Sequence, residues 1–555
     1  MKPPASRVTY YVAGTQLART HVLRFTHYAL RLTLFPLLII LLTLLPACTA
    51  ADPSAPLPTL SLVTVDPNAT ATSTPFQPAP ETPTPLPTLT VQPSVTATAS
   101  PSPSPTALPS ATATIPPLVV TIPPEATITS TPPARPQYTF YALFDYPGHQ
   151  LAVDETIRYP NQTGASLSEI VLVVDANLYA NSFALETLFL DGANANYTLD
   201  GHRLTVFLPQ PLAPGAALTL AMRYHLAIPK KQSDYPHGYD STQVNLTEWY
   251  PFVAPYAGGW ILHDAWAFGE HLVYDSADFE VNMKVSGEGV LVAAPAPAQA
   301  NGEWTQYRLN GARTFVFSAS DQYLMAESAV GSVVIRSYYF PWHSGAGEGM
   351  LRAAVQAVSL FEAKFAPYPY EVVNVVVTDV PDGQEFDGLA FLSAKFYAQY
   401  GGSAKSNMVS IGVHEIAHNW WFGLVGNDQA LEPWLDETLC VYSERLFYEY
   451  NYPNYGDWWW NFRVNYFNPT GWVDTSIYDG GTFRLYTNAA YLNGAYFMED
   501  LRVRMGERDF FAFLKDYASK YSYRRATSAD FFGTLRANTS ADVSDLVRAY
   551  FKGAY

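Results

Sequence analysis

The stretch Ile411-Gly-Val-His414-Glu415-Ile-Ala-His418-Asn-Trp-Trp-Phe-Gly423 decides the fold and the chemistry expected of this chain. On a helix, residues four apart lie on one face, so His414 and His418 can bind one metal ion. Glu415 then lies beside the metal, where it can take a proton from a bound water. The pattern therefore predicts a helix over residues 408–423 that carries a zinc site.

A catalytic zinc site needs a third protein ligand and an open position. Glu437 supplies this ligand in the run Trp434-Leu-Asp-Glu-Thr-Leu439, at the start of a helix predicted over residues 433–450. Glu432 and Glu444 are rivals, but the first precedes a proline and the second lies two turns further along. Since a His/His/Glu set suits zinc best among divalent metals, we expect one Zn²⁺ per chain, held by His414, His418 and Glu437.

The N-terminal segment reads as an export signal. An apolar run from Leu32 to Leu45 follows Arg19, Arg24 and Arg31, and it is short for a permanent membrane helix but typical of a signal peptide. Leu45-Pro46-Ala47-Cys48 resembles a lipobox, in which the cysteine is lipidated. We expect residues 1–48 to be a signal peptide with a lipobox, or an uncleaved anchor helix, and either places the folded part outside the cytoplasm, at the cell surface.

Residues 49–135 are rich in Pro, Thr, Ser and Ala and almost free of charge. Such a segment cannot bury enough apolar surface to offset its chain entropy, which predicts a disordered stalk. Cys48 and Cys440 are the only cysteines, so no disulfide framework is expected. The net charge of −17 argues against a nucleic-acid partner.

The rest of the chain divides into two predicted domains. Residues 136–330 contain short alternating runs broken by Pro and Gly, such as 169–174, 203–208, 217–224 and 279–285, which predict a β-rich saddle or sandwich. Residues 331–555 begin with strands at 333–339 and 372–377 around a helix near 350–364. Further helices are predicted at 490–505, 508–521, 529–537 and 541–551. The fold class is therefore multidomain α+β, with an α/β catalytic domain that is mostly helical in its C-terminal half.

The run from His414 to Thr438 resembles the zinc-binding signature of the gluzincins of the aminopeptidase N type, and the likeness extends over roughly residues 140–555. It implies a β-rich domain followed by a thermolysin-like catalytic domain. It also implies that peptides are the substrates. Compared with many members of that family, the chain lacks a large C-terminal helical domain, so a more open cleft is expected.

Two further segments resemble functional parts of this family. Gly383-Gln-Glu385-Phe-Asp-Gly-Leu389 resembles its exopeptidase loop, which makes Gly383 and Glu385 the expected substrate-binding residues, with Glu385 on the free α-amine. Tyr491-Leu-Asn-Gly494-Ala495 resembles the segment with the catalytic tyrosine. Tyr491 would then donate a hydrogen bond to the oxyanion, while Glu415 is the general base.

Several assignments stay open from the sequence. Gln384 replaces the family's Met, and Phe386-Asp387 depart from its pattern, so Glu385 could also be an ordinary loop carboxylate. Gln243 and Glu248 are candidates for a second amine-binding group. Asp436 is either a partner of the metal site or a favourable charge at a helix N-terminus. Trp420 and Trp421 are expected in the helix core, whereas the aromatic tract 458–466 could line the cleft or be core.

The expected activity is that of a zinc-dependent metallopeptidase which removes N-terminal residues from peptides. A zinc endopeptidase or other zinc hydrolase on the same site is the first alternative. A cell-surface binding module without catalysis is the second, although binding alone requires neither a general base nor an oxyanion donor. The oligomeric state does not follow from the sequence.

Overall fold

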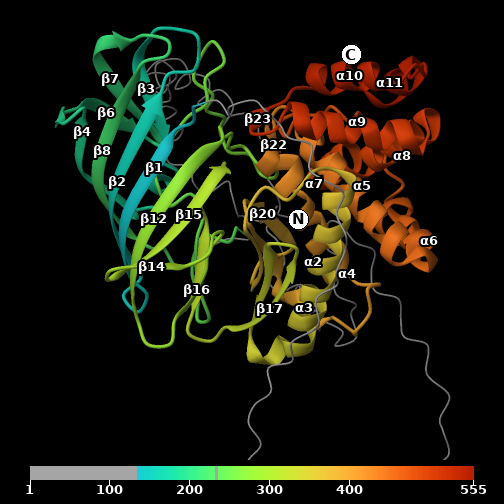
Figure 1. The fold of residues 1–555 in the computed structure, drawn as a ribbon, viewed down its shortest axis with the longest axis horizontal. Coiled ribbons are helices and arrows are strands. Elements are labelled where there is room, and N and C mark those ends of the chain that lie inside the picture. Colours follow the sequence, from blue (N-terminus) through green and yellow to red (C-terminus); the bar gives the residue numbers. More distant parts are fainter. Residues whose placement is uncertain (1–133, 232–234) are drawn as a thin grey trace, which may run out of the picture.

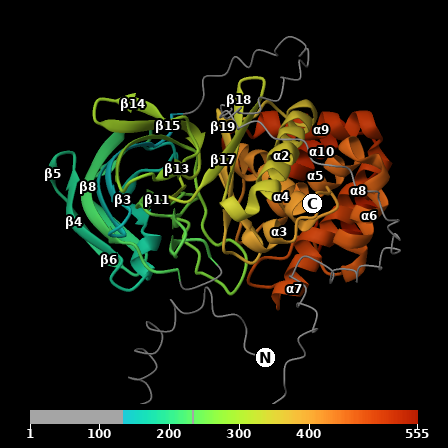
Figure 2. The ribbon, with the colours of Figure 1, turned by 90° about the horizontal axis from the view of Figure 1, so that it is seen from below.

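The computed structural model describes residues 134–231 and 235–555. A β-rich region occupies one side of the molecule, and a mixed sheet with many helices occupies the other (Figures 1 and 2). This order confirms the predicted fold class. The predicted signal peptide, lipobox and almost all of the stalk lie outside the described residues.

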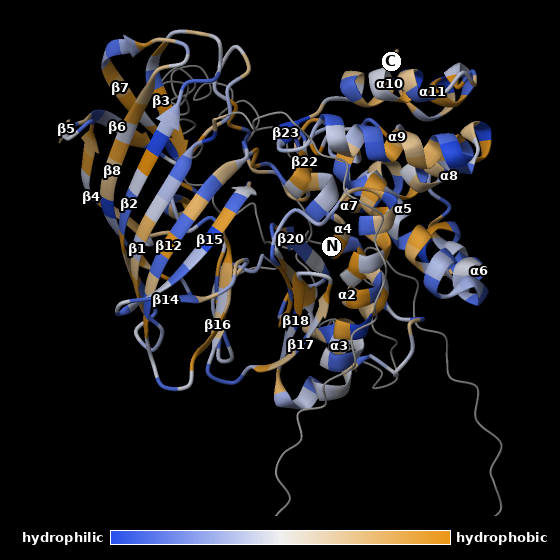
Figure 3. Cartoon of the chain, viewed as in Figure 1, coloured by the Kyte–Doolittle hydropathy of each residue, from blue (hydrophilic) through white to orange (hydrophobic). Residues whose placement is uncertain are grey.

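An eight-stranded sheet dominates the β-rich region. Buried and exposed residues alternate along β1 and β2, as expected for a sheet with one solvated face, and Figure 3 shows alternating hydrophobic and hydrophilic residues on these strands. β1 pairs in parallel with β12 and antiparallel with β2. In order across the sheet, the strands are β14 (Gln299–Asn301), β15 (Trp304–Ala312), β12 (Ala277–Ser286), β1 (Gln137–Asp145), β2 (Gln150–Pro160), β8 (Ala217–Ala227), β4 (Phe183–Leu190) and β5 (Ala193–Asn194).

Two four-stranded sheets complete this region, and buried aromatic residues fill its core. Trp249 is fully buried and packs on Phe140, with ring centroids 4.9 Å apart. The short 3-10 helix η2 (Asp175–Leu178) directly follows β3 (Leu167–Val173). The first sheet has the order β13 (Leu291–Ala293), β16 (Phe317–Ser320), β10 (Val244–Leu246), β9 (Gly238–Tyr239), and the second β11 (Phe252–Val253), β3 (Leu167–Val173), β7 (Arg203–Leu212), β6 (Asn196–Asp200).

A five-stranded mixed sheet begins the second region, in the order β17 (Leu324–Val330), β18 (Val333–Tyr339), β19 (Val372–Thr378), β21 (Leu389–Ser393), β20 (Gly383–Phe386). The sheet shows that the predicted boundary at residue 330 is too late, because β17 pairs with β18 as a hairpin. Gly331, with φ of +56°, forms the tight turn of that hairpin. The division between the two regions therefore falls before Leu324.

Helices cover this sheet and form most of the rest of the chain, together with a two-stranded sheet of β22 (Val425–Gly426) and β23 (Arg524–Arg525) (Figure 1). α2 (Ser344–Lys364) packs on β17, β18 and α4 (Asn407–Ala417), and α4 also contacts β20, β21 and α5 (Trp434–Asn451). The predicted helix 408–423 is not a continuous α-helix: α4 ends at Ala417, a π-helical turn, η4 (Asn419–Leu424), follows, and the backbone is kinked at Trp421, with φ of −105° and ψ of 42°. The remaining α-helices are α3 (Ala394–Ala398), α6 (Gly456–Trp459), α7 (Phe483–Tyr486), α8 (Gly494–Met505), α9 (Glu507–Lys520), α10 (Ser528–Asn538) and α11 (Ser544–Tyr550).

Within residues 134–231 and 235–555, every helix is too short or too polar to cross a membrane.

Candidate metal and substrate site

Helices α4 and α5 bring His414, His418 and Glu437 together. Nε2 of His414 lies 3.1 Å from Oε2 of Glu437, and Nε2 of His418 lies 3.7 Å from the same oxygen. One ligand atom from each residue lies within 4.8 Å of the other two, and all three side chains are buried. Both ends of the set are fixed by secondary structure, since Ser406 caps α4 and Glu437 lies in the first turn of α5.

Glu444 is a partner of a metal-ligand candidate rather than a rival ligand. Its Oε1 lies 3.0 Å from Nδ1 of His414, on the far side of the ring from Glu437. Arg463 and Ser410 donate to the same carboxylate, at 2.7 and 2.6 Å. Burial alone would raise the pKa of Glu444. The Arg463 guanidinium and these hydrogen bonds outweigh that effect and lower the pKa to about 2. A permanent carboxylate on Nδ1 leaves Nε2 to bind a metal.

The other rival, Glu432, points away from the histidines. Its Oε1 accepts a hydrogen bond of 3.0 Å from the Ser528 amide at the start of α10. Asp436 lies next to Glu437 in sequence, but its carboxylate contacts the side chains of Asn427 and Gln429, at 3.1 and 2.8 Å. Asp436 therefore positions Gln429 as well as the start of α5, where its Oδ1 also accepts the Glu437 amide.

Glu415 faces the edge strand β20. A β-carbon built on Gly383 would lie 2.1 Å from Oε1 of Glu415, so only glycine at that position lets the strand approach the carboxylate. Burial, followed by the charges of Glu385 and Glu437, raises the pKa of Glu415 well above its ordinary value. A raised pKa is what a carboxylate needs to act as a general base near neutral pH.

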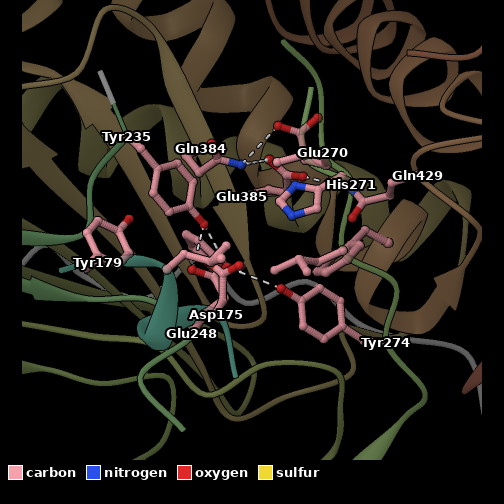
Figure 4. A pocket seen from close by; sticks show the side chains of 15 residues that line it. Asp175, Tyr179, Tyr235, Glu248, Glu270, His271, Tyr274, Gln384, Glu385 and Gln429 are labelled. Atoms are coloured by element: carbon pink, nitrogen blue, oxygen red, sulfur yellow. Dashed lines mark hydrogen bonds between the residues drawn. The ribbon is translucent and has the colours of Figure 1, made fainter. Parts of the chain in front are cut away.

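Glu385 also lies on β20 and belongs to a cluster of polar groups. Gln429 donates 2.9 Å to Oε1 of Glu385, and Gln384 donates 3.0 Å to its Oε2. The Gln384 amide also reaches Glu270 at 3.3 Å, so it bridges two carboxylates (Figure 4). Burial, then the charge of Glu270, raises the pKa of Glu385 well above its ordinary value.

Two of these residues, Glu270 and Gln429, could not be predicted from the sequence. Glu270 comes from the loop before β12 and Gln429 from the loop before α5, and neither belongs to a motif with a defined spacing. Glu270 comes close to Glu385 only because the two regions are folded against each other, whereas Gln429 reaches Glu385 by tertiary packing within the second region. The replacement of the family's Met by Gln384 has a physical reason here, since an amide can donate to both carboxylates whereas a thioether cannot.

Tyr491 lies beside the metal-ligand candidate His414. It belongs to the π-helical turn η8 (Thr487–Asn493), which precedes α8, and such turns often occur at functional sites. Its ring is parallel to that of His414 at 6.2 Å, and its hydroxyl hydrogen-bonds to the Glu437 carboxylate. The segment thus places a phenol beside the metal-ligand candidates.

A pocket extends from Glu385 into the β-rich region (Figure 4). Glu248, one of the two proposed amine-binding candidates, lines it and accepts hydrogen bonds from Tyr235 and Tyr274, at 2.7 and 3.2 Å. Burial, together with the charge of Asp175, raises the pKa of Glu248 to about 7. Gln243 does not line this pocket.

Gln243, the other candidate, is buried between the two regions. Its amide donates to the hydroxyl of Thr378 at the end of β19, and its oxygen accepts from Tyr323 at 3.3 Å. Its geometry therefore makes the amine-binding assignment for Gln243 wrong. The sequence could not separate it from Glu248, because both lie in one short segment around β10.

The large aromatic residues near the centre are mostly core. Trp420 and Trp421 are buried, and their indole nitrogens donate to Ala366 O and Ser443 Oγ. In the tract 458–466, Trp459 is fully buried and donates to Glu444 at 3.1 Å. The tract therefore positions Glu444, which contacts His414, and it is not part of the pocket wall.

Asp387 anchors the end of the Gly383–Leu389 segment. Its Oδ2 accepts the amides of Arg313 and Thr314, at 2.9 and 2.7 Å, and Tyr370 donates to its other oxygen. Arg313 and Thr314 belong to the β-rich region, whereas Tyr370 precedes β19. The departure from the family pattern at position 387 thus ties the two regions together beside the site.

The three metal-ligand candidates fit a zinc ion. They offer two imidazole nitrogens and one carboxylate, the donor set of a catalytic site with an open position. Burial and then the charge of Glu270 raise the pKa of Glu437 well above its ordinary value, and a divalent cation would offset this concentration of negative charge.

Comparison with known proteins agrees with this geometry. Residues 350–550 match the model of the peptidase family M1 domain. Aminopeptidase M1-B of Oryza sativa subsp. japonica is 26% identical over 242 residues, which cover 40% of this chain and 27% of that protein. Endoplasmic reticulum aminopeptidase 1 of Rattus norvegicus is 24% identical over 235 residues, or 40% and 25% of the two chains. The chain thus spans about a quarter of the length of these curated relatives.

A solved structure extends the likeness to both regions. The M1 zinc metallopeptidase from Deinococcus radiodurans superposes with a TM-score of 0.56 at 18% identity, covering 76% of this chain and 94% of that one. A related crystal structure with the same score is described as a two-domain M1 zinc metallopeptidase. The chain is therefore similar to the peptidase family M1 domain over residues 350–550, and it shares the fold of a two-domain M1 zinc metallopeptidase.

Proposed function

We propose that this protein is a zinc-dependent aminopeptidase that removes single residues from the N-terminus of peptides. One observation carries the proposal: one ligand atom each from Glu385, Glu415 and His418 lies within 4.8 Å of the other two. An ammonium group held by Glu385 therefore has room for only one residue before the scissile bond reaches the general base and the metal. The relatives named above are aminopeptidases, which supports the same activity.

The catalytic roles follow from the positions of the side chains. Zinc, when bound by His414, His418 and Glu437, lowers the pKa of a water and polarises a carbonyl group. Glu415 takes the proton of the attacking water and returns it to the departing amine. The Tyr491 hydroxyl donates to the oxygen on which negative charge develops. Glu444 keeps the His414 ring oriented through its contact with Nδ1.

Recognition of the substrate amine rests on the carboxylates around Gln384. Glu385 and Glu270 supply negative charge on either side of its amide, and an ammonium group placed between them gains charge-assisted hydrogen bonds. Glu270 is therefore our candidate for the second amine-binding group, and Glu248 remains a candidate from deeper in the pocket. Fixing the amine in this way orients the first peptide bond toward Glu415.

The decisive experiment compares one short peptide with its N-acetylated form, using the purified zinc-loaded protein and Glu415→Gln as the inactive control. We expect single residues to be released from the free peptide only. Equal internal cutting of both peptides would instead show an endopeptidase. Cleavage of neither, by a protein that binds zinc, would favour the alternative of a binding module.

We also propose that the enzyme is exported and held at the cell surface through Cys48. The support is the apolar run that ends in Leu45-Pro46-Ala47-Cys48, followed by a stalk-like composition over residues 49–135. The test is partitioning of the wild type and Cys48→Ala between membrane and soluble fractions. Release of the variant supports lipidation, whereas unchanged partitioning would indicate an anchor helix.

A further inference from the structure

A second group of metal-ligating side chains lies in the β-rich region. Asp175, His202 and His271 each place one ligand atom within 4.8 Å of the other two. None of them belongs to the set His414, His418 and Glu437. They come from three separate segments: η2, the turn between β6 and β7, and the loop before β12.

The backbone holds two of these segments in register. The Val174 amide donates to the carbonyl oxygen of His202 at 2.7 Å, so η2 and the β6–β7 turn are fixed against each other. Asp175 and His271 line the pocket that continues from Glu385 (Figure 4). The group is therefore part of a rigid wall of the pocket.

The distance between His202 and Asp175 suits two ligands of one ion better than a direct hydrogen bond. Nδ1 of His202 lies 3.8 Å from Oδ1 of Asp175, which is too long for a hydrogen bond. Two ligands about 2.1 Å from one tetrahedral ion lie roughly 3.4 Å apart, so only a small contraction is needed. Both of these atoms are buried without a hydrogen-bond partner, and the two residues are only 8% and 9% exposed. A buried polar group left in this way is costly unless something binds it.

A third histidine, His237, lies near the Asp175 carboxylate. His237 is buried, and its Nδ1 contacts the carbonyl oxygen of Thr247 at 2.8 Å, which leaves Nε2 for other partners. Its imidazole is close enough to Asp175 to act on it electrostatically. Several imidazoles around one carboxylate form a nitrogen-rich set of ligands. Such a set binds ions of the zinc class, whereas calcium and magnesium prefer oxygen ligands.

We propose that Asp175, His202 and His271 bind a second divalent ion of the zinc class at the wall of the substrate pocket. The ion links η2, the β6–β7 turn and the loop before β12. A fourth position is open for water or for His237. The chain then carries two zinc ions, one more than the sequence predicts, and this inference does not depend on the peptidase activity.

The first test is the metal content of the full chain after saturation with Zn²⁺ and desalting, measured by plasma mass spectrometry. We expect two zinc ions per chain in the wild type. The double variants His202→Gln/His271→Gln and His414→Gln/His418→Gln should each retain one. His225→Gln is the matched control, since His225 pairs with Glu186 at 2.6 Å on the solvated side of the same region and should keep both. One zinc in the wild type would overturn the proposal.

A second measurement guards against variants that fail to fold. In the His414→Gln/His418→Gln background, added Zn²⁺ should raise the Tm of the full chain, because an ion bound only to the folded state stabilises it. Adding the nearly isosteric Asp175→Asn substitution should abolish that rise without changing the Tm in EDTA by more than a few degrees. A rise that persists in Asp175→Asn, or no rise in the background variant, would show that the group is only a buried polar network.

Discussion

Gly383 lies directly against Glu415: a β-carbon at position 383 would fall 2.1 Å from the carboxylate oxygen and 2.5 Å from its carbon. The edge strand β20 therefore sets the position of the proposed general base by contact with its bare backbone. The same strand carries Glu385, so the base and the proposed amine anchor are aligned by one element.

Replacing Gly383 with alanine should lower kcat with little loss of zinc, because Glu415 must move while the metal ligands stay in place. Displacing a catalytic group by about 1 Å can cost on the order of 100-fold in rate. Steady-state kinetics with metal analysis would test this. Gly401→Ala is the control, since nothing lies within 4 Å of a β-carbon there. A Gly383→Ala enzyme with wild-type kcat would contradict the proposed role of Glu415.

Glu444→Gln should weaken both stability and zinc binding. The substitution leaves Arg463 as a buried cation without its carboxylate, which typically costs about 3–5 kcal/mol. It also weakens the contact with Nδ1 of His414, and loss of such a partner reduces metal affinity by about 10–100-fold. Chemical denaturation and zinc competition titrations measure the two effects.

The matched control for that change is Glu449→Gln on the same helix. Glu449 forms ion pairs with Arg445 and Arg502 at a partly exposed position. Its substitution should leave zinc affinity unchanged. Equal losses of zinc affinity in both variants would show that Glu444 acts only through the general stability of α5.

Gln429→Met should raise KM for peptides more than it lowers kcat. The Gln429 amide donates to Glu385 and to Asp436, and its loss leaves two buried carboxylates without that donor. An unsatisfied buried group costs about 1–3 kcal/mol, which corresponds to roughly 5- to 150-fold in affinity. Kinetics on free and N-acetylated peptides separate the effects. A loss confined to kcat would place Gln429 in the chemical step instead.

Glu155→Gln should stabilise the protein at neutral pH but not in acid. Glu155 is buried in the core of the β-rich region, and burial raises its pKa well above the ordinary 4.5. Above that ordinary value the unfolded state ionises first while the folded state keeps its proton, so stability falls as the pH rises. The glutamine variant lacks this loss, so its advantage in Tm should grow between pH 5 and pH 8.

Asp154→Asn provides the control for the pH experiment, because the Asp154 side chain is 54% exposed on the neighbouring position of the same strand. Its Tm difference from the wild type should be nearly the same at both pH values. If Glu155→Gln behaved in that way too, the Glu155 carboxyl would have to reach water in the folded protein.

Much of the fold could be predicted because local patterns and final structure agree. The period-two runs became strands, and the helices expected after residue 433 formed near their predicted ends, whereas the helix expected over 408–423 continues past Ala417 as a π-helical turn. The change from α-helix to a π-helical turn after Ala417 was not predicted, because the residues that follow have ordinary helix-forming patterns. Tertiary contacts decide it instead: the Asn419 side chain accepts the Tyr368 hydroxyl and the Gly388 amide.

The site was predictable where its residues share one motif and not where they meet across the molecule. His414, Glu415 and His418 follow from helical spacing, and Glu437 from the next helix. Glu270 and Gln429 lie in loops: docking of the two regions brings Glu270 to Glu385, and packing within the second region brings Gln429 there. The roles assigned to the site residues remain predictions that the experiments above can test.

The contacts of Asp387 limit how this protein can be recombined with its relatives. One buried carboxylate binds two amides of the β-rich region and a tyrosine of the other region, next to the strand that bears Gly383 and Glu385. A chimera that takes its β-rich half from another family member inherits a foreign surface at that point. Such a hybrid should keep its zinc ligands but lose the alignment of its amine anchor, so exchanging one half alone would uncouple metal binding from peptide trimming.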